Sequence, residues 1–445
     1  MQRAQGTLTL SAGDLVGYLN CKSLTCLNLA LLDGVLERPR RWDPLLQILR
    51  KRGERHEQAF LSQLRSQGLE LSVIEGIGVD SDAVSRTRNA MLGGGQIIVQ
   101  GALQNNNWVG RADVLRRVET QSNLGPWSYE VIDTKLARET KGGTILQLCL
   151  YADLVKSVQG TLPEVCYVVA PWSDYQRQRY RMDDYSAFYR RVRRSLEEFL
   201  EAPNHGEDYP EPKEFCEVCG WRTHCEARRR ADDHLCLVAG ISKLQIKELE
   251  TQAIKTVAEL AVMPLPLSWK PERGSARTYE RVREQARIQV EGRNAGRVLH
   301  EFLPLEPGFG LSILPEPSVG DLFFDLEGDR FAGEGGLEYL FGYAYRSPNG
   351  DLVYSGDWVL SRRDEKKAFE RFMDFVAARL NQYPDLHIYH FASYEPAALK
   401  RLMGRHATRE EALDRLLRAK VFVDLYSVVR HTLRASVERA MAESW

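Results

Sequence analysis

The sequence predicts an α/β protein in which two α/β regions are separated by a helical segment. Runs with apolar residues at every second position, typical of strands, alternate with helical stretches over residues 109–170 and again over residues 321–425. Between them, residues 233–262 form short amphipathic segments, and three prolines within residues 264–271 mark a linker. At 445 residues, the chain can hold two to three domains with separate cores.

The overall charge does not indicate a nucleic-acid-binding protein, because 60 Lys and Arg residues balance 61 Asp and Glu residues. Any basic surface has to be local, as in residues 190–194 or 228–230, and each of these taken singly is more simply explained as a solvated helix face. No apolar run approaches the length of a membrane span, and the N-terminus lacks the apolar core of a signal peptide. These observations predict a cytoplasmic protein without a membrane partner.

Two neighbouring strands carry the residues with the clearest chemistry. The strands over 109–115 and 129–135 place Asp113 beside Asp133, and Lys135 lies on the same face as Asp133. Paired carboxylates hold a hard cation, which lowers the pKa of bound water and neutralises charge on a scissile phosphate, while the lysine orients water or pairs with phosphate. Taken alone, the pattern suits a solvated strand edge about as well as a magnesium or manganese site.

Four motifs in this order resemble the PD-(D/E)XK nucleases, in particular the RecB-like branch that includes the CRISPR-associated exonucleases. The motifs are a helix histidine in Gly53-Glu54-Arg55-His56, a lead acid in Gly110-Arg111-Ala112-Asp113, the triplet Asp133-Thr134-Lys135, and the helix pair Gln147-x-x-x-Tyr151. The resemblance implies a catalytic site made of His56, Asp113, Asp133, Lys135, Gln147 and Tyr151. It also implies that His56 joins the two aspartates in holding Mg²⁺ or Mn²⁺, while Gln147 and Tyr151 steady Lys135 or the strand being cut.

The cysteines indicate a second metal centre. Cys149 and Cys166 lie among apolar residues and are expected in the core, whereas Cys216, Cys219 and Cys225 form a tight cluster with C-x2-C-x5-C spacing. A four-coordinate site needs one more ligand. Zinc and an iron–sulfur cluster would both accept such a set, and Cys26, His224 or Cys236 could each supply one of its ligands.

The RecB-like resemblance implies a particular answer. In that family an opening helix, here expected over residues 11–33, carries a Tyr-Leu-x-Cys run that matches Tyr18-Leu19-Asn20-Cys21. The implied centre is a [4Fe-4S] cluster on Cys21, Cys216, Cys219 and Cys225, which would pin the opening helix to the end of the nuclease domain. Zinc remains the competing metal.

The helical segment over 233–262 resembles a helix-hairpin-helix unit, in which the turn between two short helices holds a phosphate through its backbone. Such units usually have glycine where this chain has Ala253, so a plain helical spacer is the alternative. A further helix is expected over 276–290.

The last region presents Asp325 and Glu327 on one face of a strand and Glu395 where another strand runs into a helix. It resembles the RNase H-like exonucleases that carry a DEDD carboxylate set, which implies a possible second metal site on these three acids. Glu395 stands where that family has aspartate, and there is no room for the final carboxylate between Asp424 and Trp445. We therefore expect an incomplete and inactive domain, or a binding module.

Together these patterns predict a PD-(D/E)XK core of restriction-endonuclease type with a helical, cluster-pinned periphery (1–232), a helical hairpin spacer (233–314) and an incomplete RNase H-like α/β domain (315–445). The implied function is that of a metal-dependent DNA nuclease, most simply an exonuclease of repair, recombination or defence that acts on single strands or ends, with a possible helicase partner. The competing hypothesis is a non-catalytic scaffold that positions DNA for a partner helicase or nuclease.

Overall fold

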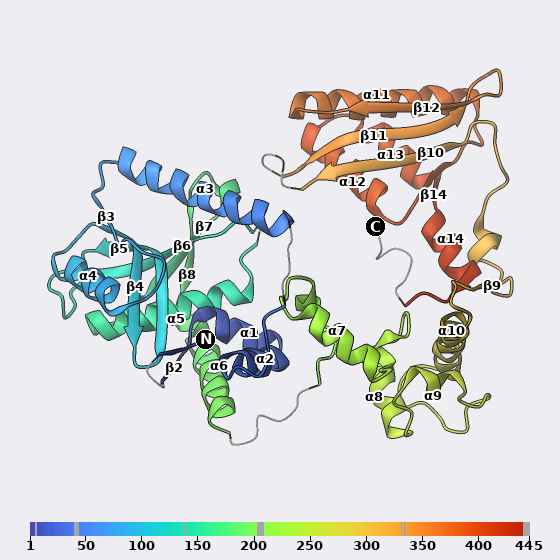
Figure 1. Cartoon of the computed structure of the whole chain (residues 1–445). Coiled ribbons are helices and arrows are strands. Elements are labelled where there is room, and N and C mark those ends of the chain that lie inside the picture. Colours follow the sequence, from blue (N-terminus) through green and yellow to red (C-terminus); the bar gives the residue numbers. More distant parts are fainter. Residues whose placement is uncertain are drawn as a thin grey trace. The chain divides into compact units, whose positions relative to one another are not determined.

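The computed structural model describes residues 1–4, 7–39, 44–137, 139–202, 209–330, 332 and 335–438. The chain divides into two compact units, residues 1–228 and residues 229–445. The division falls close to the boundary that we expected after residue 232. Figure 1 shows the elements of both units, which are described separately below.

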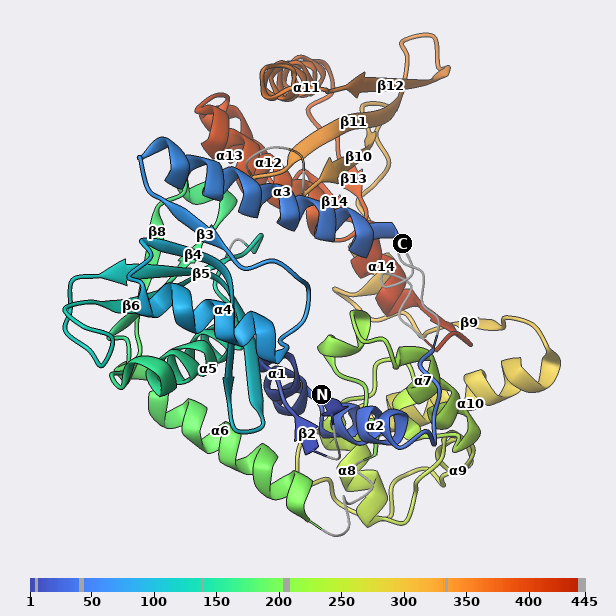
Figure 2. The same cartoon turned by 60° about the vertical axis from the view of Figure 1, so that its left-hand side comes forward.

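The first unit is built on a six-stranded sheet with the order β3-β4-β5-β6-β7-β8. Strands β6 and β7 are parallel and are joined across the sheet by helix α5, whereas β5 is antiparallel to both of its neighbours. In both views α3 lies on one side of the sheet and α5 and α6 lie on the other (Figures 1 and 2). The elements are β1 (Gln2–Ala4), β2 (Thr7–Thr9), α1 (Ala12–Asn20), α2 (Lys22–Leu32), α3 (Pro44–Ser66), β3 (Leu71–Val73), α4 (Ser81–Leu92), β4 (Ile97–Asn105), β5 (Trp108–Val118), β6 (Ser128–Thr134), α5 (Gly142–Gln159), β7 (Val165–Val169), β8 (Arg177–Arg181), α6 (Asp183–Glu201) and α7 (Arg222–Ala231), with short 3-10 helices at Pro171–Ser173 and Glu214–Glu217.

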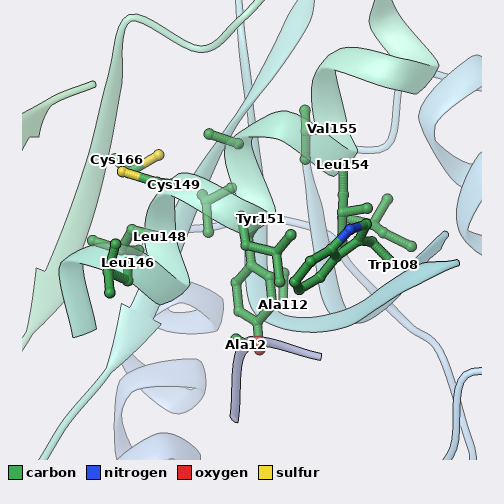
Figure 3. Packing of buried hydrophobic residues seen from close by; sticks show 14 of the residues in the cluster. Ala12, Trp108, Ala112, Leu146, Leu148, Cys149, Tyr151, Leu154, Val155 and Cys166 are labelled. Carbon is green, nitrogen blue, oxygen red and sulfur yellow. The ribbon is translucent and has the colours of Figure 1, made fainter. Parts of the chain in front are cut away.

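Each face of this sheet has its own hydrophobic core. The period-two pattern sends Val131 of β6 into the core under α5 and Ile132 into the core under α3. Helix α5 packs so closely on β5 that a Cβ at Gly110 would lie 2.7 Å from the ring of Tyr151. Figure 3 shows Tyr151 beside Ala112 and Trp108 in this core, with Cys149 of α5 close to Cys166 of β7. Among the helices in the described ranges, none is both long and apolar enough to cross a membrane.

The expected single helix over residues 11–33 is wrong in one respect, because the structure has two helices there. Cys21 interrupts them with an extended backbone (φ −160°, ψ 109°), ending α1 and beginning α2. Nothing in the helix-forming composition of this stretch marks such a break. The break removes Cys21 from the side of a continuous helix and turns it toward the cysteine-rich segment described below.

The second unit contains a five-stranded sheet with the order β12-β11-β10-β13-β14, in which the first three strands are antiparallel and the last three parallel. Helices α11, α12 and α13 share one core with one face of β10, so they cover the same side of the sheet. The elements are α8 (Lys243–Thr251), α9 (Val257–Ala261), α10 (Ala276–Ala295), β9 (His300–Phe302), β10 (Leu322–Asp329), β11 (Leu337–Arg346), β12 (Leu352–Trp358), α11 (Arg362–Gln382), β13 (Ile388–His390), α12 (Tyr394–His406), α13 (Glu410–Arg418), β14 (Phe422–Asp424), α14 (Leu425–Thr432) and β15 (Leu433–Ala435), with 3-10 helices at Leu235–Leu237 and Gly310–Ile313. Residues 439–445 of the expected domain lie outside the described ranges.

The helical segment forms its own core from α8, α9 and α10, and α8 and α9 are joined by a short turn, as the resemblance to a helix-hairpin-helix implied. Ala253 in this turn has a φ of +62°. This left-handed conformation is readily adopted by glycine and disfavoured for a residue with a Cβ atom. Ala253 thus has a left-handed backbone at the position where the resembling units usually have glycine.

Replacing Ala253 with glycine should therefore stabilise the second unit by about 0.5 to 1 kcal/mol, because the strain at a positive φ is removed. Calorimetry of the full chain would detect this as a higher transition temperature for that unit. Ala258, an exposed residue within α9, provides the matched control. Ala258→Gly should lower stability by about 1 kcal/mol, as glycine does inside a helix, and a decrease for Ala253→Gly as well would contradict the assignment of strain.

Candidate active site and thiol site

A kink in the first sheet sets the direction of Asp113. In a regular strand Ala112 and Val114 would face the same side, but here Ala112 lies in the α5-side core and Val114 in the α3-side core. The ladder between β4 and β5 is interrupted at this point, where Gln100, opposite Asp113, has a φ of +55°. Asp113 is therefore half-buried at the kink, between a residue of one core and a residue of the other.

Asp113 and Asp133 lie close together beside this kink. Oδ2 of Asp113 accepts hydrogen bonds from the backbone N–H and the hydroxyl of Thr134, both at 2.8 Å, which fixes it beside the end of β6. Asp133 is fully buried, and this burial, followed by the charge of Asp113, raises its pKa to about 7. Two neighbouring carboxyl groups, one of them desolvated, form a site where a cation would stabilise the ionised forms.

The side chain of Lys135 lies beside Asp133. Its Nζ atom lies 2.6 Å from Oδ2 of Asp133. The two groups form an ion pair, but they are not aligned as a hydrogen bond, and Oδ2 otherwise lacks a hydrogen-bond partner. The ammonium lowers the pKa of Asp133 less than burial raises it. The lysine side chain remains partly exposed, so it can reach a group outside the protein while it stays beside the acid.

Gln147 and Tyr151 come from successive turns of α5 and act on Asp133. The side-chain amide of Gln147 donates to Oδ1 of Asp133 at 3.3 Å and to the Tyr151 hydroxyl at 3.1 Å. Burial, and then the charge of Asp133, raise the pKa of Tyr151, which keeps it a neutral phenol. The geometry thus ties this pair to the buried acid, whereas the sequence had suggested contact with Lys135 or with the strand being cut.

His56 lies on α3, and the structure does not bring it onto the carboxylates. Its Nε2 atom is 3.0 Å from the carbonyl oxygen of Val169, which also accepts the backbone N–H of Lys135 at 3.0 Å. The ring is buried and stacks on Tyr175 at a centroid distance of 5.9 Å. The histidine therefore braces the end of β7 beside Lys135, and its expected role as a metal ligand stays a prediction.

The neighbouring residue, Glu57, reaches the site instead. Its carboxylate accepts a hydrogen bond of 2.6 Å from the side chain of Gln100, the residue opposite Asp113. Partial burial, followed by the charge of Asp113, raises the pKa of Glu57, and the charge of Lys135 opposes this. Sequence reasoning missed this third acid, although its place directly after the helix histidine was a signal that could have found it.

The donor set suits a hard divalent cation. Glu57, Asp113 and Asp133 offer carboxylate oxygens, the ligands that Mg²⁺ and Mn²⁺ prefer, and one buried oxygen of Asp133 has no hydrogen-bond partner. In the part of the chain that the structure describes, no three His, Cys, Asp or Glu side chains are already arranged at coordination positions. Cation binding would therefore require small rotations of these carboxylates.

Four cysteines line the same small cavity at a separate place in the first unit, although among the described residues their side chains are not arranged at coordination positions. Cys21, at the break between α1 and α2, lines one small cavity together with the other three predicted ligands, Cys216, Cys219 and Cys225. The backbone N–H of Lys213 donates to the sulfur of Cys216 at 3.4 Å, a contact that also stabilises a thiolate bound to metal. The Trp221 indole donates to Asn28 of α2 at 2.9 Å, which ties the N-terminal helices to this segment.

The alternative ligands are placed differently. Neither Cys26 nor His224 lines the cavity, although the leucines on either side of Cys26, Leu24 and Leu27, do. Cys236 belongs to the second unit. The backbone break at Cys21 thus distinguishes Cys21 from Cys26 as the fourth ligand. A prediction of one continuous helix over this stretch does not reveal the break.

The three acids predicted in the second unit are not assembled into one group among the described residues. Asp325 and Glu327 are exposed on the face of β10 that the helices leave open. Glu395 is buried at the start of α12, with Oε2 3.4 Å from Nδ1 of His390. Asp424 already accepts the backbone N–H groups of Ala392 and Tyr426, both at 2.9 Å. A second catalytic centre on these residues remains a prediction.

Two regions of the chain match the profiles of known families. Residues 30–226 match the PD-(D/E)XK nuclease superfamily, and residues 322–443 match the RNase_H superfamily. No curated protein matches the chain. The first match contains the kinked strand, both aspartates and Lys135, and the second contains the five-stranded sheet.

Proposed function

We propose that this chain, which joins a PD-(D/E)XK nuclease superfamily domain to an RNase H superfamily domain, is a metal-dependent DNA nuclease that cuts at the site around Asp113, Asp133 and Lys135. The single observation that carries the proposal is the convergence of these three side chains at the kink in β5. A domain that only positions DNA would not need a fully buried aspartate beside a second acid and a lysine. Exonucleolytic action on single strands or ends is the form of activity that we propose.

Each residue of the site has a different proposed role, which follows from its surroundings. A bound Mg²⁺ or Mn²⁺ would lower the pKa of water and neutralise charge on the scissile phosphate. Glu57, Asp113 and Asp133 would hold the cation. Lys135, partly exposed beside Asp133, would orient the nucleophilic water or the phosphate, and the Gln147–Tyr151 pair would keep Asp133 in place.

For the thiol site we propose a structural or DNA-sensing role, since hydrolysis of a phosphodiester transfers no electrons. Its ligands would be Cys21, Cys216, Cys219 and Cys225, which share one cavity. Thiolates suit both a [4Fe-4S] cluster, which is our proposal, and a single zinc ion, the competing metal. In either case the metal would link the break after α1 to the first turn of α7 and the segment that precedes it.

The test of the proposal is metal-dependent cleavage by the full chain. Single-stranded DNA labelled at one end and then at the other should be shortened in Mg²⁺ or Mn²⁺ and left intact in EDTA, and the two labels report the polarity. An intact substrate in both cations, with binding retained, would favour the scaffold function instead.

A finer prediction separates Glu57 from the histidine beside it. Glu57→Gln should weaken Mn²⁺ binding by about 10-fold, because it removes a charged oxygen ligand from the site, and titration calorimetry of the full chain would measure this. Glu54→Gln is the matched control, because Glu54 lies on the same helix and pairs with Arg50. Equal affinities for the Glu57 variant and the wild type would remove Glu57 from the proposed ligand set.

A further inference from the structure

A cavity in the second unit has no part in either site described above. It has a volume of about 450 Å³ and lies between the start of α8, one face of α10, and the end of α14 with β15. This is within the range of about 300 to 1,000 Å³ found for small-molecule sites. The turn predicted to hold phosphate, around Ala253, is at the opposite end of α8, so the cavity is a different place on the helical segment.

The lining of the cavity is strongly basic. Arg273, Arg281, Arg430 and Arg434 line it, and no Asp or Glu does. Arg434 pairs with Glu301. The other three guanidinium groups are exposed and make no ion pair or side-chain hydrogen bond within the described residues.

Other arginines of α10 show that the lack of carboxylate partners is confined to the cavity. Four other arginines on the same helix all pair with carboxylates: Arg277 with Glu306, Arg283 with Glu284, Arg287 with Glu301 and Arg293 with Asp233. Arg281 alone among these faces the cavity. The uncompensated positive charge is thus concentrated where three separate segments converge.

We propose that this cavity binds phosphate groups of a nucleic-acid strand. A guanidinium group offers a planar fork of N–H donors that matches phosphate oxygens, and it remains charged at all physiological pH values. The apolar side chains of Leu303 and Leu433 also line the cavity and suit the sugars of a strand, whereas Ser242 and Gln245, which line it too, bond to each other in the cap of α8.

The chemistry of the cavity favours a strand over a free nucleotide. The ring of Tyr279, the aromatic residue in the lining, is buried, and its hydroxyl donates to Glu248, so it offers no face for a stacked base. Three exposed arginines from different elements suit an extended anion that continues beyond the cavity. The inference rests on the proposed function only in taking nucleic acid as the substrate.

The experiment uses the full chain in EDTA, so that binding is measured without cleavage. A triple variant, Arg273→Gln, Arg281→Gln and Arg430→Gln, should bind fluorescent single-stranded oligothymidylate about 100-fold more weakly than the wild type at ~0.1 M salt. The slope of log affinity against log salt should fall by about 2, at about 0.7 for each of three lost phosphate contacts. Its folding should be unchanged, because the three side chains are exposed and unpaired.

The matched control is a second triple variant, Arg371→Gln, Arg409→Gln and Arg418→Gln. It removes the same amount of charge from the same unit, but at arginines that have carboxylate partners. It should change the slope by much less. Wild-type affinity and slope in the first variant would overturn the inference, and so would loss of dTMP binding with oligonucleotide binding retained. No step of this experiment depends on cleavage, so it can be told apart from a failure of the nuclease proposal. If only the nuclease proposal fails, the triple variant still binds more weakly than the wild type, but neither protein cuts DNA.

Discussion

Asp133→Asn should abolish cleavage and at the same time stabilise the metal-free protein. The substitution replaces a charged carboxylate with a neutral amide, which holds a divalent cation much less tightly, so we expect cleavage to fall by roughly 1,000-fold or more. It also removes a buried charge whose ionised form is unfavourable in the folded state. The stabilisation at pH 8 should be on the order of 1 to 4 kcal/mol, since each pKa unit corresponds to about 1.4 kcal/mol.

The pH dependence gives this prediction a definite sign. The pKa of Asp133 rises on folding from 3.8 to about 7, so the folded state holds the proton more tightly than the unfolded state. The destabilisation by Asp133 therefore develops as pH rises from about 4 to about 7 and stays constant above that. Melting temperatures of the variant and the wild type in EDTA should converge near pH 4 and separate toward pH 7.

Asp153→Asn is the control for this experiment, because Asp153 lies on α5 and forms an ion pair with Arg193. That variant should keep its activity and should not gain stability. If Asp133→Asn melts below the wild type at pH 8, favourable contacts stabilise the ionised carboxylate in the folded protein. The claim that its buried charge destabilises the metal-free protein would then be wrong.

The second large effect is expected at the thiol site. Cys216→Ser should lose the bound metal and lower the stability of the first unit by several kcal/mol, because metal binding at a structural site contributes directly to folding. Protein purified without oxygen should be brown and contain about four irons per chain if the cluster is [4Fe-4S]. A colourless protein with one zinc would decide for the competing metal and leave the four ligands in place.

Cys26→Ser tests the choice of ligands, since Cys26 lies on α2 only five residues from Cys21 but outside the cavity. It should retain full metal content, whereas Cys21→Ser should not. Equal loss in the two variants would contradict the assignment of Cys21. Full metal content in Cys216→Ser would exclude the thiol site altogether.

The sequence predicted the elements whose signals are local. The period-two pattern located β5 and β6 and the two aspartates, and the spacing of the cysteines located three thiols of one cavity. It did not predict β8, because Arg177–Arg181 carries charged side chains at an exposed position next to β7 and lacks an apolar alternation.

Features created by distant contacts could not be predicted. Glu57 reaches the active site through Gln100, 43 residues away, and the ring of His56 bonds to Val169, 113 residues away. The kink at Asp113 lies opposite Gln100, which has a positive φ although glutamine is a residue type without a strong preference for that conformation. Tertiary packing decided these points, and the local sequence contains no equivalent signal.

The most direct test of the central claim compares two variants of the full chain, Lys135→Ala and Asp325→Ala, with the wild type on end-labelled single-stranded DNA in Mn²⁺. Both residues are at least partly exposed, so neither substitution opens a buried cavity. The account predicts that Asp325→Ala cuts at the wild-type rate and that Lys135→Ala is slower by roughly 100-fold or more. Cleavage at the wild-type rate by Lys135→Ala, with loss of cleavage in Asp325→Ala, would contradict it and move the catalytic centre to the second unit.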